Sequence, residues 1–136
     1  MSKLTKVAAA VALALAGSAQ AQVSGNVVKI GVMSDMSSLY ADIGGPGSVA
    51  AARMAVQDFG ADKKGMKVEI VTADHQNKPD VGSSVARQWY DVDGVDVIVD
   101  VPTSSVALAV NQVTRDKGKA FLVSPMTSRP LGSVWR

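Results

Sequence analysis

The sequence predicts an α/β protein built on a parallel sheet that carries helices on both faces. Segments with strand character alternate with segments of helical spacing at about 30 residues per unit, as expected where each parallel strand pair needs a crossover. The composition agrees, since 47% of the 136 residues are hydrophobic and 19% are charged, which is too apolar for a disordered chain. This length allows one domain.

Four strands are expected where β-branched residues dominate or alternate with polar residues. They cover residues 27–33, 67–73, 95–99 and 120–123. Three helices are expected between them, where apolar residues recur every three or four positions. They cover residues 48–59, residues 104–116, and a middle segment that begins near Pro79 and is marked by Val81, Val85, Trp89 and Val92.

Local signals set the expected boundaries of these elements. Gly60 is predicted to end the first helix, and Pro79 suits the first turn of the second because a proline there needs no N–H partner. The glycine-rich stretch 44–47 is interpreted as a flexible turn. It lacks the GxGxxG spacing and does not directly follow a strand, which argues against a dinucleotide site. The helical spacing predicts that Trp89 is a core residue.

The first 21 residues predict a secretory signal peptide. Lys3 and Lys6 form a positive segment, residues 7–16 are an apolar run, and Ala19-Gln20-Ala21 is a small-residue cleavage motif, which are the three parts of such a signal. The run is shorter than the about 20 residues that a membrane span needs. We therefore expect an exported protein, periplasmic in a Gram-negative cell, without stable membrane insertion and with residues 22–136 as the mature part.

Charge and residue usage exclude several function classes. Two of the 14 cationic residues lie in the signal peptide, so the mature part carries 12 positive and 12 negative charges, and its net charge is no argument for binding nucleic acid. The absence of cysteine excludes a thiolate zinc site and a cysteine nucleophile. The sequence contains no P-loop, GxSxG or HExxH motif. With no nucleophile–base pair or metal set visible, we expect no enzyme activity, no cofactor and no metal.

Candidate binding residues follow the strands, because ligands bind beyond the carboxyl ends of strands in such sheets. Thr103 and Ser104 follow the third strand and open the third helix, where backbone N–H groups and the helix dipole favour a carboxylate. A plain N-cap is the alternative for these hydroxyl residues. Tyr40 follows the first strand and offers an aromatic face and a hydroxyl; a packing role is its alternative.

His75 is the single histidine and has Asp74 and Asp80 near it in the sequence. This combination is compatible with a metal ligand or a base. With no second histidine and no cysteine, a transition-metal site cannot be completed. We therefore interpret His75 as a polar loop residue.

Three segments, at residues 29–47, 73–80 and 97–106, together resemble a known family. They are similar to the extracytoplasmic substrate-binding proteins of ABC transporters, of the branched-chain amino acid (leucine/isoleucine/valine) type with a type I periplasmic binding fold. The resemblance implies two α/β lobes that close on a small-molecule ligand and deliver it to a membrane permease. It places Tyr40 in the pocket, assigns the ligand's α-carboxylate to Thr103 and Ser104, and adds the loop that begins at Ser124.

The expected function is therefore solute binding for an ABC importer, with a branched-chain or related amino acid as ligand. A ligand-sensing receptor module of the same fold is one alternative, and a binding protein for aromatic carboxylates or amides is another. The resemblance ends near residue 124, where the segment Pro125–Arg136 shows no clear period. We therefore expect residues 22–136 to form an incomplete first lobe, an N-terminal fragment that binds ligand weakly.

Overall fold

The computed structural model describes residues 26–124 of the chain. The predicted signal peptide and the tail beyond Ser124 lie outside these residues. Four strands form one sheet: β1 (Val27–Ser34), β2 (Lys67–Asp74), β3 (Val97–Asp100) and β4 (Ala120–Val123). All neighbouring strands pair in parallel, in the spatial order β2-β1-β3-β4. The predicted parallel sheet is confirmed.

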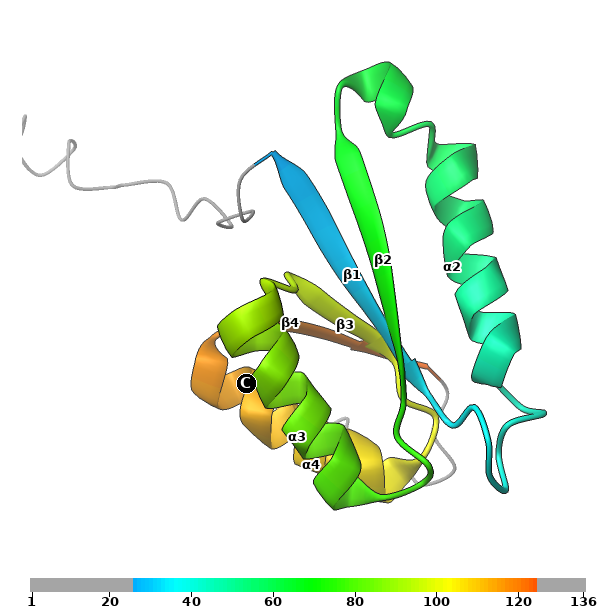
Figure 1. The fold of residues 1–136 in the computed structure, drawn as a ribbon, viewed down its shortest axis with the longest axis vertical. Coiled ribbons are helices and arrows are strands. Elements are labelled where there is room, and N and C mark those ends of the chain that lie inside the picture. The colour runs from blue at the N-terminus through cyan, green and yellow to red at the C-terminus, as the bar shows by residue number, and fades with distance from the viewer. Residues whose placement is uncertain (1–25, 125–136) are drawn as a thin grey trace, which may run out of the picture.

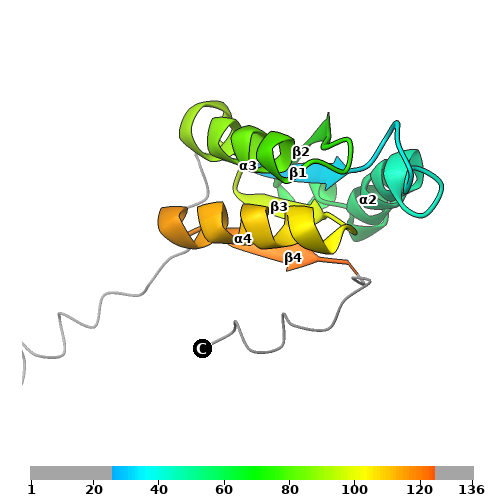
Figure 2. The ribbon, with the colours of Figure 1, turned by 90° about the horizontal axis from the view of Figure 1, so that it is seen from below.

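Three helices connect the strands: α2 (Gly45–Phe59), α3 (Pro79–Gln88) and α4 (Ser104–Lys117). In Figures 1 and 2, α2 lies on one face of the sheet, and α3 and α4 lie side by side on the other. This division follows from right-handed crossovers, because the step from β1 to β2 runs toward one edge of the sheet while the later steps run toward the other. Within residues 26–124, no helix is long and apolar enough to span a membrane.

The main hydrophobic core lies between the sheet and the α3–α4 layer. Strand residues and helix residues contribute to it together, among them Met33, Ile98, Phe121, Val106 and Val110. Trp89 is 6% exposed and belongs to this core, which confirms its predicted role. The ring packs directly over Gly31 in the central strand β1.

The second predicted helix has a different end from the one that its spacing indicates. It is α-helical only to Gln88 and continues as a π turn over Trp89–Asp93. A π turn holds more residues per turn than an α-helix, so it rotates the following side chains out of register. Val92 is accordingly 70% exposed, and its predicted place on the apolar face of the helix is wrong.

Two other boundaries differ from the predicted ones. Helix α2 begins at Gly45, three residues before the predicted start, with Pro46 in its first turn, because the fixed φ of proline suits that position. Part of the glycine-rich stretch is therefore helix. Strand β3 begins at Val97; the N–H of Val95 donates to the Trp89 carbonyl at 2.9 Å and closes the π turn. Gly60 ends α2 in the left-handed conformation, as predicted.

Candidate functional site

The loop after β1 is organised by the buried carboxylate of Asp35. This carboxylate accepts hydrogen bonds from the Ser38 hydroxyl at 2.5 Å, the Ser38 N–H at 2.9 Å and the Tyr40 N–H at 2.9 Å. Burial raises the pKa of Asp35, but these hydrogen bonds outweigh it and hold the pKa below the ordinary value of 3.8. The charged carboxylate thus fixes the backbone that carries Tyr40, which is half-buried.

Asp74, at the end of β2, joins the first two loops. One of its oxygens accepts from the N–H groups of Met36 at 2.9 Å and Gln76 at 2.8 Å, and the other accepts from the Ser37 hydroxyl at 2.5 Å. Burial raises the pKa of Asp74, yet the bonds from Ser37, Met36 and Gln76 lower it below 3.8 overall. Strand pairing in register places residue 74 opposite Ser34, so it can reach the loop that follows β1.

His75 is fully buried beneath these loops, more deeply than its interpretation as a polar loop residue implies. The backbone N–H of His75 donates to the Ser34 carbonyl at 3.0 Å, and the ring Nδ1 accepts from the backbone N–H of Asn77 at 3.0 Å. Nδ1 as acceptor places the ring proton on Nε2, which has no partner among the described residues. Burial lowers the pKa of His75 despite the nearby carboxylates. In the described part of the chain, no three histidine, aspartate or glutamate side chains gather in a group that could hold a metal ion.

The start of α4 presents unpaired polar atoms at the same edge of the sheet. Thr103 is the N-cap residue of α4, as the N-cap alternative expects, but its side chain makes no capping hydrogen bond. Within residues 26–124, its Oγ1 and the Oδ2 of Asp100 are buried without a hydrogen-bond partner. Asp100 and Val101 have positive φ angles of 80° and 60°, a conformation that non-glycine residues adopt at a cost.

The loops of three strands meet at this edge. The Ser124 N–H donates to the Asp100 carbonyl at 3.1 Å, so the loop after β4 contacts the end of β3, three residues before Thr103. Tyr40 comes from the loop of the neighbouring strand β1. Ser104 is the first residue of α4. The four residues predicted from the sequence therefore lie on the loops at one edge, while their contact with a ligand stays a prediction.

Polar atoms of three residues surround Gly44. A β-carbon built on this glycine would lie 3.0 Å from Ser34 Oγ, 3.2 Å from Ser48 Oγ and 3.3 Å from Asp100 Oδ2. These oxygens come from the ends of two neighbouring strands and from the first turns of α2. The rule that ligands bind beyond strand ends points to Ser34 and Asp100 from the sequence, but nothing in the local pattern marks Ser48.

In parallel α/β sheets, ligands bind at the carboxyl edge, where the polar loops of this chain gather. The family model described as periplasmic binding protein matches residues 27–133. The chain belongs to the periplasmic binding protein family. The match runs past residue 124, near which we expected the resemblance to end. No curated protein matches the chain.

Solved structures of longer proteins resemble the chain. A periplasmic binding protein from Burkholderia mallei is 46% identical, with a TM-score of 0.71, and the match covers 76% of this chain and 28% of that one. A branched-chain amino acid ABC transporter periplasmic ligand-binding protein from Burkholderia xenovorans is 48% identical, with a TM-score of 0.70 and coverages of 74% and 27%. The chain thus spans little more than a quarter of these proteins.

A more distant structure shares the fold alone. It is the solute-binding protein of an ABC transporter from Rhodopseudomonas palustris, solved in complex with 3,4-dihydroxybenzoic acid. It is 22% identical, with a TM-score of 0.68, and the match covers 74% of this chain and 28% of that one.

Proposed function

We propose that the chain acts in the periplasm as a solute-binding component of an ABC importer, with a branched-chain or related amino acid as ligand. The family membership and the 48% identity to the Burkholderia xenovorans protein support this role. The signal-peptide pattern supports the location. The partner that follows from this role is the membrane permease of the importer.

The observation that carries the proposal is the unpaired hydroxyl of Thr103 at the start of α4. Its Oγ1 is buried without a partner among the described residues, and the first N–H groups of a helix have no partner within the helix. Together with the helix dipole, these donors favour a carboxylate. In this proposal Thr103 and Ser104 hold the α-carboxylate, Ser124 borders it across Asp100, and Tyr40 covers the ligand with its ring.

A hydroxylated aromatic carboxylate is a second candidate ligand. The Rhodopseudomonas palustris protein was solved with such a molecule, and the same donors at α4 suit any carboxylate. Asp100 has a buried Oδ2 that is unpaired within the described residues. It would accept a hydrogen bond from a phenolic hydroxyl of this ligand, or from the ammonium group of an amino acid.

Binding by the chain alone is proposed to be weak. The chain spans 27–28% of the length of its two more similar solved relatives, so it supplies only part of the surface that encloses a ligand in a cleft. Small-molecule sites usually bury more than about 70% of their ligand. A partial surface therefore gives saturation only at high ligand concentration.

An NMR titration of the chain with L-leucine and with 3,4-dihydroxybenzoate tests the proposal. We expect saturable shifts of the backbone amides of residues 103–105 with at least one ligand, at millimolar rather than micromolar concentration. Thr103→Ala should weaken this binding, and Thr103→Ser, which keeps the hydroxyl, should retain it. Absence of shifts at the start of α4 with both ligands would refute the site, and micromolar affinity in calorimetry would refute the proposed weakness.

A further inference from the structure

A second candidate binding site lies on the α2 face of the sheet, next to the loops that Asp74 joins. It is a cavity of about 410 Å³ between the first half of α2, the end of β2 and the loop after β1. Its lining residues are Met36, Pro46, Val49, Ala50, Arg53, Thr72, Ala73 and Asp74. None of the four predicted ligand residues is among them, so the cavity is separate from the proposed amino-acid site. Its volume lies within the range of about 300–1,000 Å³ typical of small-molecule sites.

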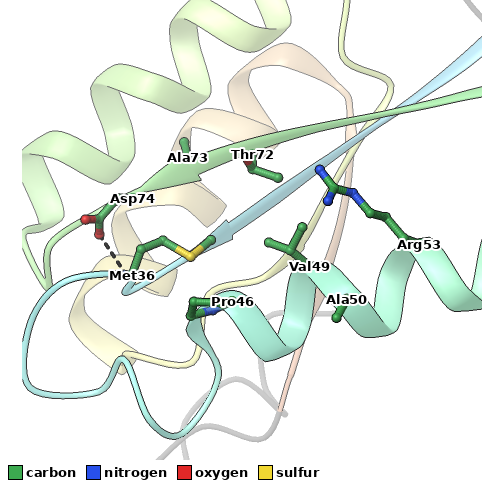
Figure 3. A pocket seen from close by; sticks show the side chains of 8 residues that line it. All are labelled: Met36, Pro46, Val49, Ala50, Arg53, Thr72, Ala73 and Asp74. Carbon is green, nitrogen blue, oxygen red and sulfur yellow. Dashed lines mark hydrogen bonds between the residues drawn. The ribbon is translucent and has the colours of Figure 1, made fainter.

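The cavity has two charged side chains, Asp74 and Arg53, and only one of them already has hydrogen-bond partners among the described residues. Figure 3 shows Asp74 at one end, bound to the loop at Met36, and Arg53 at the other end, extending from α2 toward Thr72. The Asp74 carboxylate already accepts three hydrogen bonds from its own loops. Arg53 has no ion pair or hydrogen bond within residues 26–124. The free charge of the cavity is therefore positive.

The space between these two ends is apolar. Met36, Pro46 and Val49 stand between Asp74 and Arg53 in the close-up view of Figure 3. Val49 and Arg53 are four residues apart on α2, which places them on one face of the helix. An apolar group of a ligand can thus lie along this wall while a charged group of the same ligand reaches the guanidinium.

We propose that this cavity binds a small organic carboxylate with a short aliphatic body. The guanidinium of Arg53 presents two parallel N–H donors, a geometry that matches a carboxylate. The aliphatic body lies against Met36 and Val49, and Thr72 offers a further hydroxyl beside the carboxylate. This site does not depend on the proposed transport function.

An NMR titration of the full chain with 4-methylpentanoate tests the proposal. We expect saturable shifts of the amides of Val49, Ala50 and Ala73, which line the cavity. Because Arg53 is exposed, Arg53→Gln should weaken this binding about two- to fivefold, the size expected of a solvent-exposed ion pair. The neutral amide 4-methylpentanamide should bind more weakly by a similar factor.

Two control variants show whether the binding depends on this cavity. Arg87 is exposed on α3, on the opposite face of the sheet, so Arg87→Gln should leave the binding unchanged. Thr103→Ala removes the hydroxyl of the proposed amino-acid site and should leave the shifts of Val49, Ala50 and Ala73 unchanged. The proposal is overturned if no shifts occur at the cavity, if Arg53→Gln binds as the parent does, or if the shifts are confined to residues 103–105.

Discussion

The ring of Trp89 occupies the space in which a side chain at residue 31 would lie. A β-carbon built on Gly31 would be 2.4 Å from Trp89 Cζ3 and 2.5 Å from Trp89 Cε3, far closer than two carbon atoms can approach without contact strain. Gly31 lies in β1, which is paired on both sides. The glycine therefore lets the π turn after α3 close directly onto the middle of the sheet.

Gly31→Ala is expected to destabilise the protein by about 1–3 kcal/mol, the usual range for overpacking a core. The added methyl group meets the indole ring of a buried residue, and neither the central strand nor the ring has free space to move into. Urea unfolding followed by far-UV circular dichroism measures the change in the free energy of unfolding.

Gly47→Ala is the matched control for this substitution. A β-carbon at residue 47 would have no heavy atom within 4 Å, and residue 47 lies in the first turn of α2. We expect a neutral effect or a stabilisation of up to about 1 kcal/mol, because alanine favours the helix. Equal effects of the two substitutions would contradict the role assigned to the contact with Trp89.

Asp74→Asn tests the link between the first two loops. The amide oxygen can still accept from Met36, but the amide nitrogen must donate to the Ser37 hydroxyl oxygen instead of accepting from it, and the bonds lose their charge. We expect a loss of about 1–2 kcal/mol at pH 7. The lowered pKa of Asp74 means that its ionised form stabilises the folded state above pH 3.8, and that this contribution is lost as the pH falls through the folded pKa.

The stability difference between the parent chain and Asp74→Asn should therefore shrink on acidification from pH 7 to pH 3. Denaturant unfolding at both values measures it. Asp80→Asn is the control, because Asp80 is exposed at the start of α3 and should show a small effect at both pH values. A difference that does not change with pH would show that the Asp74 charge is not what holds the loops.

The Tyr90 hydroxyl joins α4 to the start of β4. It donates to the Ala120 carbonyl at 3.0 Å and lies 3.2 Å from Thr114 Oγ1, and burial raises its pKa. Tyr90→Phe leaves the carbonyl without this donor and should cost about 0.5–1.5 kcal/mol. Tyr40→Phe is the control, because the Tyr40 hydroxyl has no hydrogen bond within residues 26–124, and thermal unfolding should show little change. Similar losses for both variants would refute the assigned role.

Local sequence patterns were sufficient for most of the fold. The β-branched runs and the helical spacings mark all four strands and three helices, because each element buries a periodic apolar face. The end of the second helix could not be predicted in this way. It depends on the contact of Trp89 with Gly31, residues that lie 58 positions apart in the sequence and meet only in the folded sheet.

The sequence indicates which loops carry the candidate site residues, but it does not indicate the hydrogen bonds that hold these loops in place. The rule that ligands bind at the carboxyl ends of strands selects Tyr40 and Thr103 from the sequence alone. The hydrogen bonds that hold their loops come from Asp35 and Asp74. The strand-end rule includes both aspartates, but no local pattern shows which backbone groups they bind. Asp74 reaches Met36 only because β1 and β2 pair in parallel register.

Protonation of His75 is expected to destabilise the folded chain. The Nδ1 atom already accepts from Asn77, so protonation would put a second donor against that N–H and break the bond. Burial lowers the pKa below the ordinary value of 6.5, although Asp35, Asp74 and Asp100 act in the opposite direction. The unfolded chain therefore binds more protons than the folded one just below pH 6.5, and the free energy of unfolding should fall as the pH decreases through that window.

Because His75 is the single histidine, its ring proton resonances report the folded pKa directly. His75→Gln should abolish the pH dependence between pH 6.5 and the folded pKa, and a titration midpoint at or above 6.5 would contradict the assignment of a neutral, buried ring.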